Sequence, residues 1–213
     1  MEESRELRFK CTRCGNCCMD INTVVNVTYH DILRIKNALD LSLEEIIEVL
    51  GFYVFEHEPT EEERKKMVVP PIETERGPAF VGLRKIKYGE GYRCYFYNSE
   101  EKRCLIYGAR PNFCKTFPFT FRILFNKEDP TKAKIKMDYT DKAIEYCPGI
   151  GEEAPDIDEV KWILVGKETI EQMQDDKVLI TKWNEAVKAG EIEPSVKNYL
   201  ITLLNLEDQG ENN

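Results

Sequence analysis

Histidine is scarce in this sequence, with only His30 and His57 among 213 residues. A nucleophilic cysteine or serine needs a partner base, which is often histidine. The two histidines lie in separate contexts, one in a helical segment and one in a loop, so the sequence offers no Cys–His pair for nucleophilic catalysis. We expect both on the surface and outside any metal site.

Long apolar runs are also missing. No stretch approaches the roughly 18 apolar residues that a membrane span needs. The first ten residues, MEESRELRFK, resemble neither a secretory signal nor a transit peptide. We therefore expect a soluble, cytoplasmic protein without a membrane partner. Cytosolic thiols are kept reduced, which disfavours disulfides.

Nucleotide-binding loops are absent as well, because YGEGY and PGIGEE lack the strand-to-helix setting of a phosphate loop. The net charge is −9, yet residues 79–142 hold 14 Lys and Arg against 7 Asp and Glu. An acidic chain without a recognition motif argues against nucleic acid as a partner. The basic segment fits a solvated surface, an anionic partner or compensation for an anionic metal site.

Cysteine is what the sequence has in quantity. Residues 11–18 read CTRCGNCC, and four further cysteines follow at wide spacing. A Cys-x-x-Cys turn aims two sulfurs at one ion, and this run contains two overlapping copies. Cysteines can instead be small core residues, but here Lys10, Thr12, Arg13 and Asn16 are interleaved with them. The sequence therefore predicts metal ligation by all eight: Cys11, Cys14, Cys17, Cys18, Cys94, Cys104, Cys114 and Cys147.

The adjacent pair Cys17 and Cys18 suggests two sites. Neighbouring side chains of an extended segment point in opposite directions, so one of the two is expected to serve a second site. Three close cysteines and a later Cys-Pro are similar to a ferredoxin run, which groups Cys11, Cys14, Cys17 and Cys147. By elimination the second group is Cys18, Cys94, Cys104 and Cys114. We expect the cysteine run to meet the segment 94–114 and Cys147 in space.

The rest of the chain predicts an α+β fold, with a small strand-rich, metal-stapled core, flanking helices and a helical extension. Helix signals include capping boxes at Thr28 and Ser42, a turn in TEEERKKM and a short helix between Pro111 and Pro118. We expect a strand at 21–28, a loop at 69–78, hairpins over 79–98 and 120–140, and helices over 158–190 and 195–208. We divide the chain into a cysteine domain, 1–150, and a helical extension packed on it, 151–213.

Four segments of the sequence resemble those of a known family. FKCTRCGNCC, HDILRIKNAL, CYFYNSEEKRCLIYGARPNFCKTFPF and CPG stand in the order seen in the CxxCxxCC cysteine-cluster family of zinc- or iron-chelating domains. The resemblance covers about residues 9–149 and implies metal binding. Lys115 departs from it, because the family usually has Arg after this cysteine. A similar cluster occurs in flagellin lysine methylases that use S-adenosylmethionine, but kinship of domains does not fix function.

Two functions compete on these grounds. The first is a metal-binding protein that holds a 4Fe-4S cluster, Zn²⁺ or both in a structural or redox role, with iron–sulfur favoured by the third close cysteine and by Pro148. The alternative is a metal-cluster enzyme, for example lysine-methylase-like, that modifies a protein or a small anionic molecule received by Arg93, Arg103, Arg110 and Lys115. We assign Arg110 and Lys115 to the cofactor's surroundings, with Arg110 supporting the thiolates. A metal carrier is disfavoured because the ligands are scattered through the fold.

Overall fold

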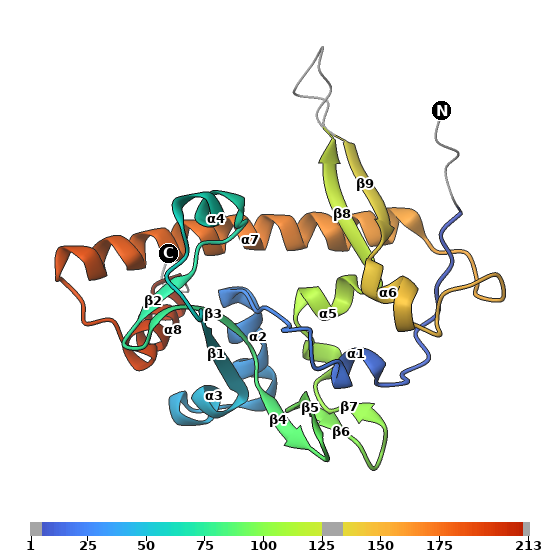
Figure 1. Ribbon diagram of the computed structural model, residues 1–213, viewed down its shortest axis with the longest axis horizontal. Coiled ribbons are helices and arrows are strands. Elements are labelled where there is room, and N and C mark those ends of the chain that lie inside the picture. Colours follow the sequence, from blue (N-terminus) through green and yellow to red (C-terminus); the bar gives the residue numbers. More distant parts are fainter. Residues whose placement is uncertain (1–5, 125–133, 211–213) are drawn as a thin grey trace.

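The computed structural model of the protein describes residues 6–124 and 134–210 (Figure 1). Helices and small antiparallel sheets alternate along the chain, and one long helix, α7 (Glu159–Ala189), extends along most of the molecule. The predicted α+β class is confirmed. None of the described helices is both long and apolar enough to span a lipid bilayer.

The two helices predicted after the cysteine run are confirmed. In α2 (Tyr29–Leu39), the Thr28 hydroxyl accepts a hydrogen bond from the Asp31 amide, and the Asp31 carboxylate accepts one from the Thr28 amide. The next helix, α3 (Leu43–Val49), begins with the same arrangement at Ser42. Such capping boxes satisfy amides that the first helical turn leaves unpaired. Local sequence therefore fixes where both helices start.

A three-stranded antiparallel sheet follows these helices. Its strands are β1 (Leu50–Val54), β2 (Ile72–Thr74) and β3 (Gly77–Leu83), in the spatial order β1-β3-β2. The predicted turn of helix is present as α4 (Glu61–Lys66). The loop predicted over 69–78 is wrong in part, because β2 pairs with β3 inside it.

The hairpin predicted over residues 79–98 is wrong in its first half. Residues 79–83 belong to β3, and the hairpin consists of β4 (Lys85–Tyr88) and β5 (Gly91–Cys94). Strand β3 is buried at most of its positions and pairs with β1 along residues 79–83. Burial and long-range pairing therefore outweigh the local hairpin signal.

The strand predicted over residues 21–28 is reduced to one isolated bridge, between Asn26 and Gly82. The Leu83 amide also donates to the Val25 carbonyl at 2.9 Å. Strand β2 pairs only with residues 77–79 of β3. Two segments thus share one edge of β3, and the stretch left for 21–28 is too short for a regular strand.

The elements that surround the central cysteines are short. They are β6 (Tyr97–Asn98), β7 (Arg103–Cys104), the 3-10 helix η1 (Tyr107–Ala109), α5 (Asn112–Thr116), β8 (Phe119–Leu124), β9 (Lys134–Tyr139) and α6 (Asp141–Tyr146). Helix α5 lies between Pro111 and Pro118, as predicted. Strands β8 and β9 form the second predicted hairpin; its connection, KEDPTK at 127–132, lies outside the described residues.

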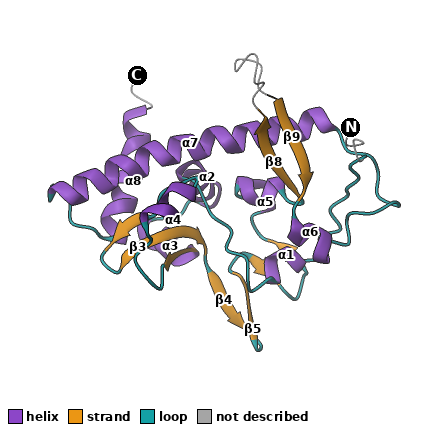
Figure 2. Ribbon diagram, turned by 45° about the horizontal axis from the view of Figure 1, so that its top comes forward, coloured by secondary structure: helices purple, strands orange, loops and turns teal. Residues whose placement is uncertain are grey.

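The two C-terminal helices match the predicted segments 158–190 and 195–208. Helix α7 is capped by the Asp158 side chain and ends at Gly190, whose φ of 74° favours glycine. Helix α8 (Val196–Gly210) follows after a short connection. Figure 2 shows α7 reaching from the neighbourhood of α8 to the β8–β9 hairpin.

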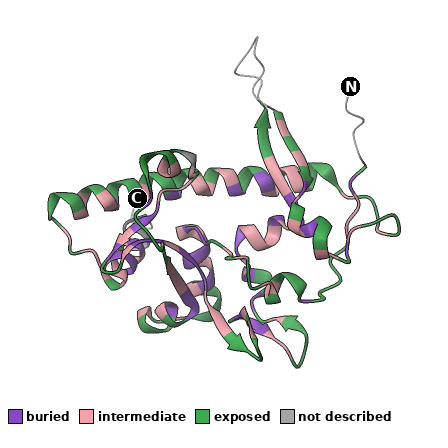
Figure 3. Cartoon of the chain, viewed as in Figure 1, coloured by how far each residue is buried: buried purple, intermediate pink, exposed green. Residues whose placement is uncertain are grey.

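Helix α7 takes part in two hydrophobic cores. The main core includes Trp183 of α7 and Tyr199 of α8 together with residues of α2, α3 and the three-stranded sheet. A smaller core forms around Leu7, Phe119 and Tyr139, against which Trp162 of α7 packs. Figure 3 shows the buried residues along the inner faces of these elements. The division of the chain at residue 150 stays a prediction. Helix α7 contacts α2 and β2 as well as α5, β8 and β9 of the cysteine-bearing region, residues 1–150.

Candidate metal centre

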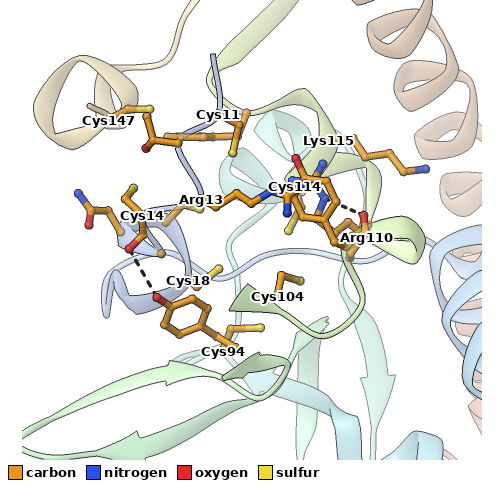
Figure 4. A pocket seen from close by; sticks show the side chains of 18 of the residues that line it. Cys11, Arg13, Cys14, Cys18, Cys94, Cys104, Arg110, Cys114, Lys115 and Cys147 are labelled. Carbon is orange, nitrogen blue, oxygen red and sulfur yellow. Dashed lines mark hydrogen bonds between the residues drawn. The ribbon is translucent and has the colours of Figure 1, made fainter. Parts of the chain in front are cut away.

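One cavity of the protein is lined by every cysteine of the chain. It has a volume of about 250 Å³, and its walls come from the N-terminal loop and from segments around β5, β7, α5 and α6 (Figure 4). All eight cysteines are free thiols: Cys11, Cys14, Cys17, Cys18, Cys94, Cys104, Cys114 and Cys147. The expectation that the cysteine run meets the central segment and Cys147 is confirmed.

Two hydrogen bonds to backbone carbonyls hold the N-terminal loop beside Cys147. The Lys10 amide donates to the Gly149 carbonyl at 2.9 Å. The Asn16 side chain donates to the Tyr146 carbonyl at 3.0 Å. These two contacts flank the first part of the cysteine run, and so they bring it to the C-terminal end of α6.

A glycine shapes the turn at the centre of this loop. Gly15 has a φ of 83° and precedes α1 (Asn16–Met19), and its carbonyl accepts a hydrogen bond from the Cys18 amide at 2.9 Å. The ring of Tyr97 fills the space that a side chain at position 15 would need. The Tyr97 hydroxyl also donates to the Cys14 carbonyl at 3.5 Å. The turn is therefore fixed against β6.

The conformation of the adjacent cysteines differs from the extended segment that was expected. Cys17 and Cys18 lie in α1 and not in an extended segment. Successive helical side chains are rotated by about 100° instead of about 180°, so both thiols line the same cavity. The premise that one of them must point away is wrong. Any division into two sites has to rest on how the other thiols are grouped.

The two adjacent thiols are unequal. The Cys18 thiol donates a hydrogen bond to Cys17, which is the largest cause that lowers the pKa of Cys17 to about 7; burial opposes it and the Arg110 charge assists it. The same hydrogen bond, burial and the charges of Cys17, Cys94 and Cys114 raise the pKa of Cys18. Cys17 is thus the thiol that forms a thiolate more readily.

The three central cysteines, Cys94, Cys104 and Cys114, line the cavity together. Burial is the largest cause that raises the pKa of Cys94, to about 11, and it also raises the pKa values of Cys104 and Cys114. The charges of Cys94 and Cys104 act on Cys114, and Cys17 acts on all three. These thiols share one neighbourhood that also reaches Cys18.

Cys147 has different neighbours. Burial raises its pKa, and the charges that raise it further are those of Cys14, Cys17 and Cys11. The thiols therefore fall into two neighbourhoods, with Cys17 acting on members of both. These effects do not assign Cys17 to one group, and the predicted division into two four-sulfur sites stays a prediction.

The donor set suits a metal, but the sulfurs are not drawn together. Within residues 6–124 and 134–210, no group of three or more Cys, His, Asp or Glu side chains converges closely enough to hold an ion. Eight free thiols around one cavity are chemically fit for zinc or for iron. Ligation would require the thiols to move closer together.

Arg110 and Lys115, both assigned to the cofactor's surroundings, differ in their placement. The Arg110 charge acts on Cys17, Cys104 and Cys114. Lys115 lines the cavity, but its side chain extends away from the thiols toward α7 in Figure 4. Burial and the neighbouring Arg34 lower the pKa of Lys115.

Other residues considered for the site are engaged elsewhere. Arg103 forms an ion pair with Glu101, and Arg93 donates to the Tyr97 carbonyl. His30 contacts Asp175 of α7, and His57 contacts Glu63 of α4. The anion-receiving set of the enzyme alternative is therefore not assembled as a group of four.

Sequence reasoning missed several side chains that line the cavity. They are Arg13 within the cysteine run and the aromatic residues Phe9, Tyr97, Tyr107, Phe117, Tyr146 and Trp162. Arg13 stands inside the Cys-x-x-Cys turn and could have been singled out for that reason. The aromatic residues carried no local signal, because they reach the cavity through tertiary contacts.

One family model matches the chain. It is that of the CxxCxxCC family, described as "putative zinc- or iron-chelating domain", and it matches residues 10–148. All residues that line the cysteine-lined cavity lie within this range except Phe9 and Trp162. No solved structure matches the chain.

Proposed function

Because the chain belongs to the CxxCxxCC family of zinc- or iron-chelating domains, we propose that it binds metal at two four-thiolate sites. The first is formed by Cys11, Cys14, Cys17 and Cys147, and the second by Cys18, Cys94, Cys104 and Cys114. The observation that carries this proposal is the gathering of all eight free thiols around one cavity. The charges of Cys11 and Cys14 act on Cys147 and those of Cys94 and Cys104 act on Cys114, which supports the two groups, whereas Cys17 acts on members of both.

The role is structural or redox. Bound zinc would supply a cross-link between elements, and a 4Fe-4S cluster would supply electron transfer. The chain's own contribution is to hold the thiols, to shield them with aromatic side chains and to place the Arg110 charge beside them. Four thiolates suit either metal, and the third close cysteine and Pro148 favour iron–sulfur for at least one site.

Anaerobic purification followed by metal analysis and an absorption spectrum tests this proposal. Cys147→Ser and Cys104→Ser address one site each. We expect each variant to lose the metal of its own site and keep that of the other, and the double variant to lose nearly all, since each site needs its own four thiolates. His57→Asn is the control, because His57 is exposed and contacts Glu63; it should keep the full content.

Two results would contradict the proposal. Complete loss of metal from either single variant would indicate one shared site instead of two. Full metal content in both variants would exclude these cysteines as ligands. The spectrum separates zinc, which has no visible absorption, from an iron–sulfur cluster.

One observation favours the enzyme alternative. A second cavity of about 420 Å³ shares Cys17, Cys18, Cys94 and Cys114 with the first, and its other walls are mainly apolar. Its size falls in the range of small-molecule sites. An organic substrate bound there would lie against the thiols, as a lysine-methylase-like activity would require. Titration with S-adenosylmethionine tests this alternative, and binding lost in a cavity-filling Thr169→Phe variant would favour it.

A further inference from the structure

Two guanidinium groups converge on one aromatic ring at the cysteine-lined cavity. The Arg110 guanidinium carbon lies 3.8 Å from the centroid of the Tyr107 ring, and that of Arg13 lies 4.6 Å from it. All three residues line the cavity. In Figure 4 the Arg13 side chain extends from the cysteine loop toward Arg110. Two like charges are thus held close together at a partly exposed ring.

Neither arginine has an acidic partner in the described parts of the chain. Five other arginines, Arg8, Arg34, Arg64, Arg84 and Arg103, each form an ion pair with a carboxylate. Arg110 donates through Nε to the Tyr107 carbonyl at 3.1 Å, and that bond leaves its two terminal nitrogens available. A stacked guanidinium presents its N–H edges in a fixed plane, which suits the paired oxygens of a carboxylate or phosphate.

The two arginines reach the ring from different parts of the fold. Arg110 directly follows η1, which contains Tyr107, whereas Arg13 stands in the cysteine run between Cys11 and Cys14. Arg13 has a φ of 56°, which is uncommon for a residue with a side chain.

We infer that Arg13 and Arg110, stacked on Tyr107, form a binding site for the carboxylate or phosphate group of a small molecule beside the metal-binding thiols. This inference rests on the proposed function and names the ligand class of the same cavity. Arg110 serves both the thiolates and the anion, whereas Arg13 serves the anion. A ligand held there by its anionic group would place the rest of its structure over the cysteines.

Calorimetric titration of the metal-loaded protein tests the site, with inorganic phosphate and acetate as probes and chloride used to hold ionic strength constant. We expect saturable binding of at least one probe, and the stronger of the two identifies the anionic group. Arg13→Gln should weaken that binding by roughly tenfold, the usual effect of losing a charge-assisted hydrogen bond. Arg13→Lys, which keeps the charge without the fork, should weaken it less. Arg103→Gln is the matched control, because Arg103 pairs with Glu101.

The metal content of each sample separates the possible failures. Absence of metal from the wild-type protein would overturn the proposed function. Normal metal content without saturable binding of either probe, or with equal affinity in Arg13→Gln and Arg103→Gln, would overturn the anion site alone. Loss of metal from Arg13→Gln would assign Arg13 to the thiolates and would likewise overturn it.

Discussion

Gly15 and Tyr97 adjoin so closely that a Cβ atom at position 15 would overlap the phenol ring of Tyr97. Gly15 also has a φ of 83°. Contact and backbone conformation therefore both demand glycine here. The relationship fixes the turn of the cysteine run against β6, which is the strand that leads to Cys104 through its pairing with β7. The close packing of Gly15 on Tyr97 thus holds the N-terminal cysteines near Cys104.

Gly15→Ala should destabilise the protein by about 3 kcal/mol, because it combines a left-handed conformation with a steric overlap. The free energy of unfolding in urea, measured at constant metal, checks this value. Gly89→Ala is the matched control, because Gly89 has a φ of 58° but open space around it, so only the conformational cost of about 1–2 kcal/mol remains. Equal losses in the two variants would show that the Tyr97 contact has no energetic weight.

Removal of metal should lower the melting temperature. A metal that binds only the folded chain adds its binding free energy to folding, and for a chain of this size the expected decrease is on the order of 10 °C. Anaerobic thermal unfolding with and without chelator measures it. Cys114→Ser should show a lower melting temperature and a smaller response to chelator. A variant that lost its metal but kept its melting temperature would indicate a peripheral site.

Arg110→Gln should weaken metal retention by about tenfold, because the lost charge acts on three thiols and outer groups of this kind tune ligand affinity. Competition with a chromogenic chelator measures the affinity. Arg103→Gln should behave as wild type. Unchanged metal affinity in Arg110→Gln, together with loss of phosphate or acetate binding, would favour the enzyme alternative over support of the thiolates.

Asn112 connects the metal region to α7 and should be essential to stability. Asn112 is fully buried. Its backbone N–H donates to the Asp31 carboxylate, and its side-chain NH₂ donates to Gln172 at 3.0 Å and to Glu168 at 3.3 Å. Asn112→Ala leaves buried polar groups unpaired, which should cost roughly 2–4 kcal/mol. Chemical denaturation checks this, with the exposed Asn205→Ala as control. A loss below about 0.5 kcal/mol would argue that α7 is attached only loosely to the cysteine-bearing region.

Asp176 should make stability fall as the pH rises through the acidic range. Burial is the largest cause that raises its pKa from 3.8 to about 7, and the charges of Asp31 and Asp175 raise it further. The hydrogen bond that the Tyr29 amide donates to its carboxylate opposes this shift. Between these values the unfolded chain loses a proton that the folded chain keeps, so folding becomes less favourable with increasing pH.

Asp176→Asn retains an acceptor for the Tyr29 amide and removes the buried charge. We expect it to be more stable than wild type above about pH 7, by a few kcal/mol, with the advantage disappearing below about pH 4. Unfolding curves of both proteins across this range measure the difference. Asp40→Asn, at an exposed position away from Asp176, should show no such pH-dependent advantage. A constant difference between Asp176→Asn and wild type at all pH values would contradict the assigned titration.

Several elements could be predicted from the sequence because their signals are local. The capping boxes at Thr28 and Ser42 set the starts of α2 and α3 because a side chain and an amide three residues apart satisfy each other. Asp158 caps the start of α7 by accepting a hydrogen bond from the Lys161 amide, and Gly190 ends it in a left-handed conformation. The Cys-x-x-Cys spacing identified the thiols, since a tight turn needs no distant partner.

Which of these features meet in space depends on long-range contacts of the fold. Strand β3 lies outside the hairpin because it pairs with β1 over residues 79–83 and is buried at most of its positions. Cys17 and Cys18 face one cavity because α1 follows the turn that Gly15 makes against Tyr97. Arg13 and Arg110 are 97 positions apart in the chain and meet at Tyr107 through the fold alone. Such contacts are between residues that are distant in sequence, so no local sequence pattern predicts them.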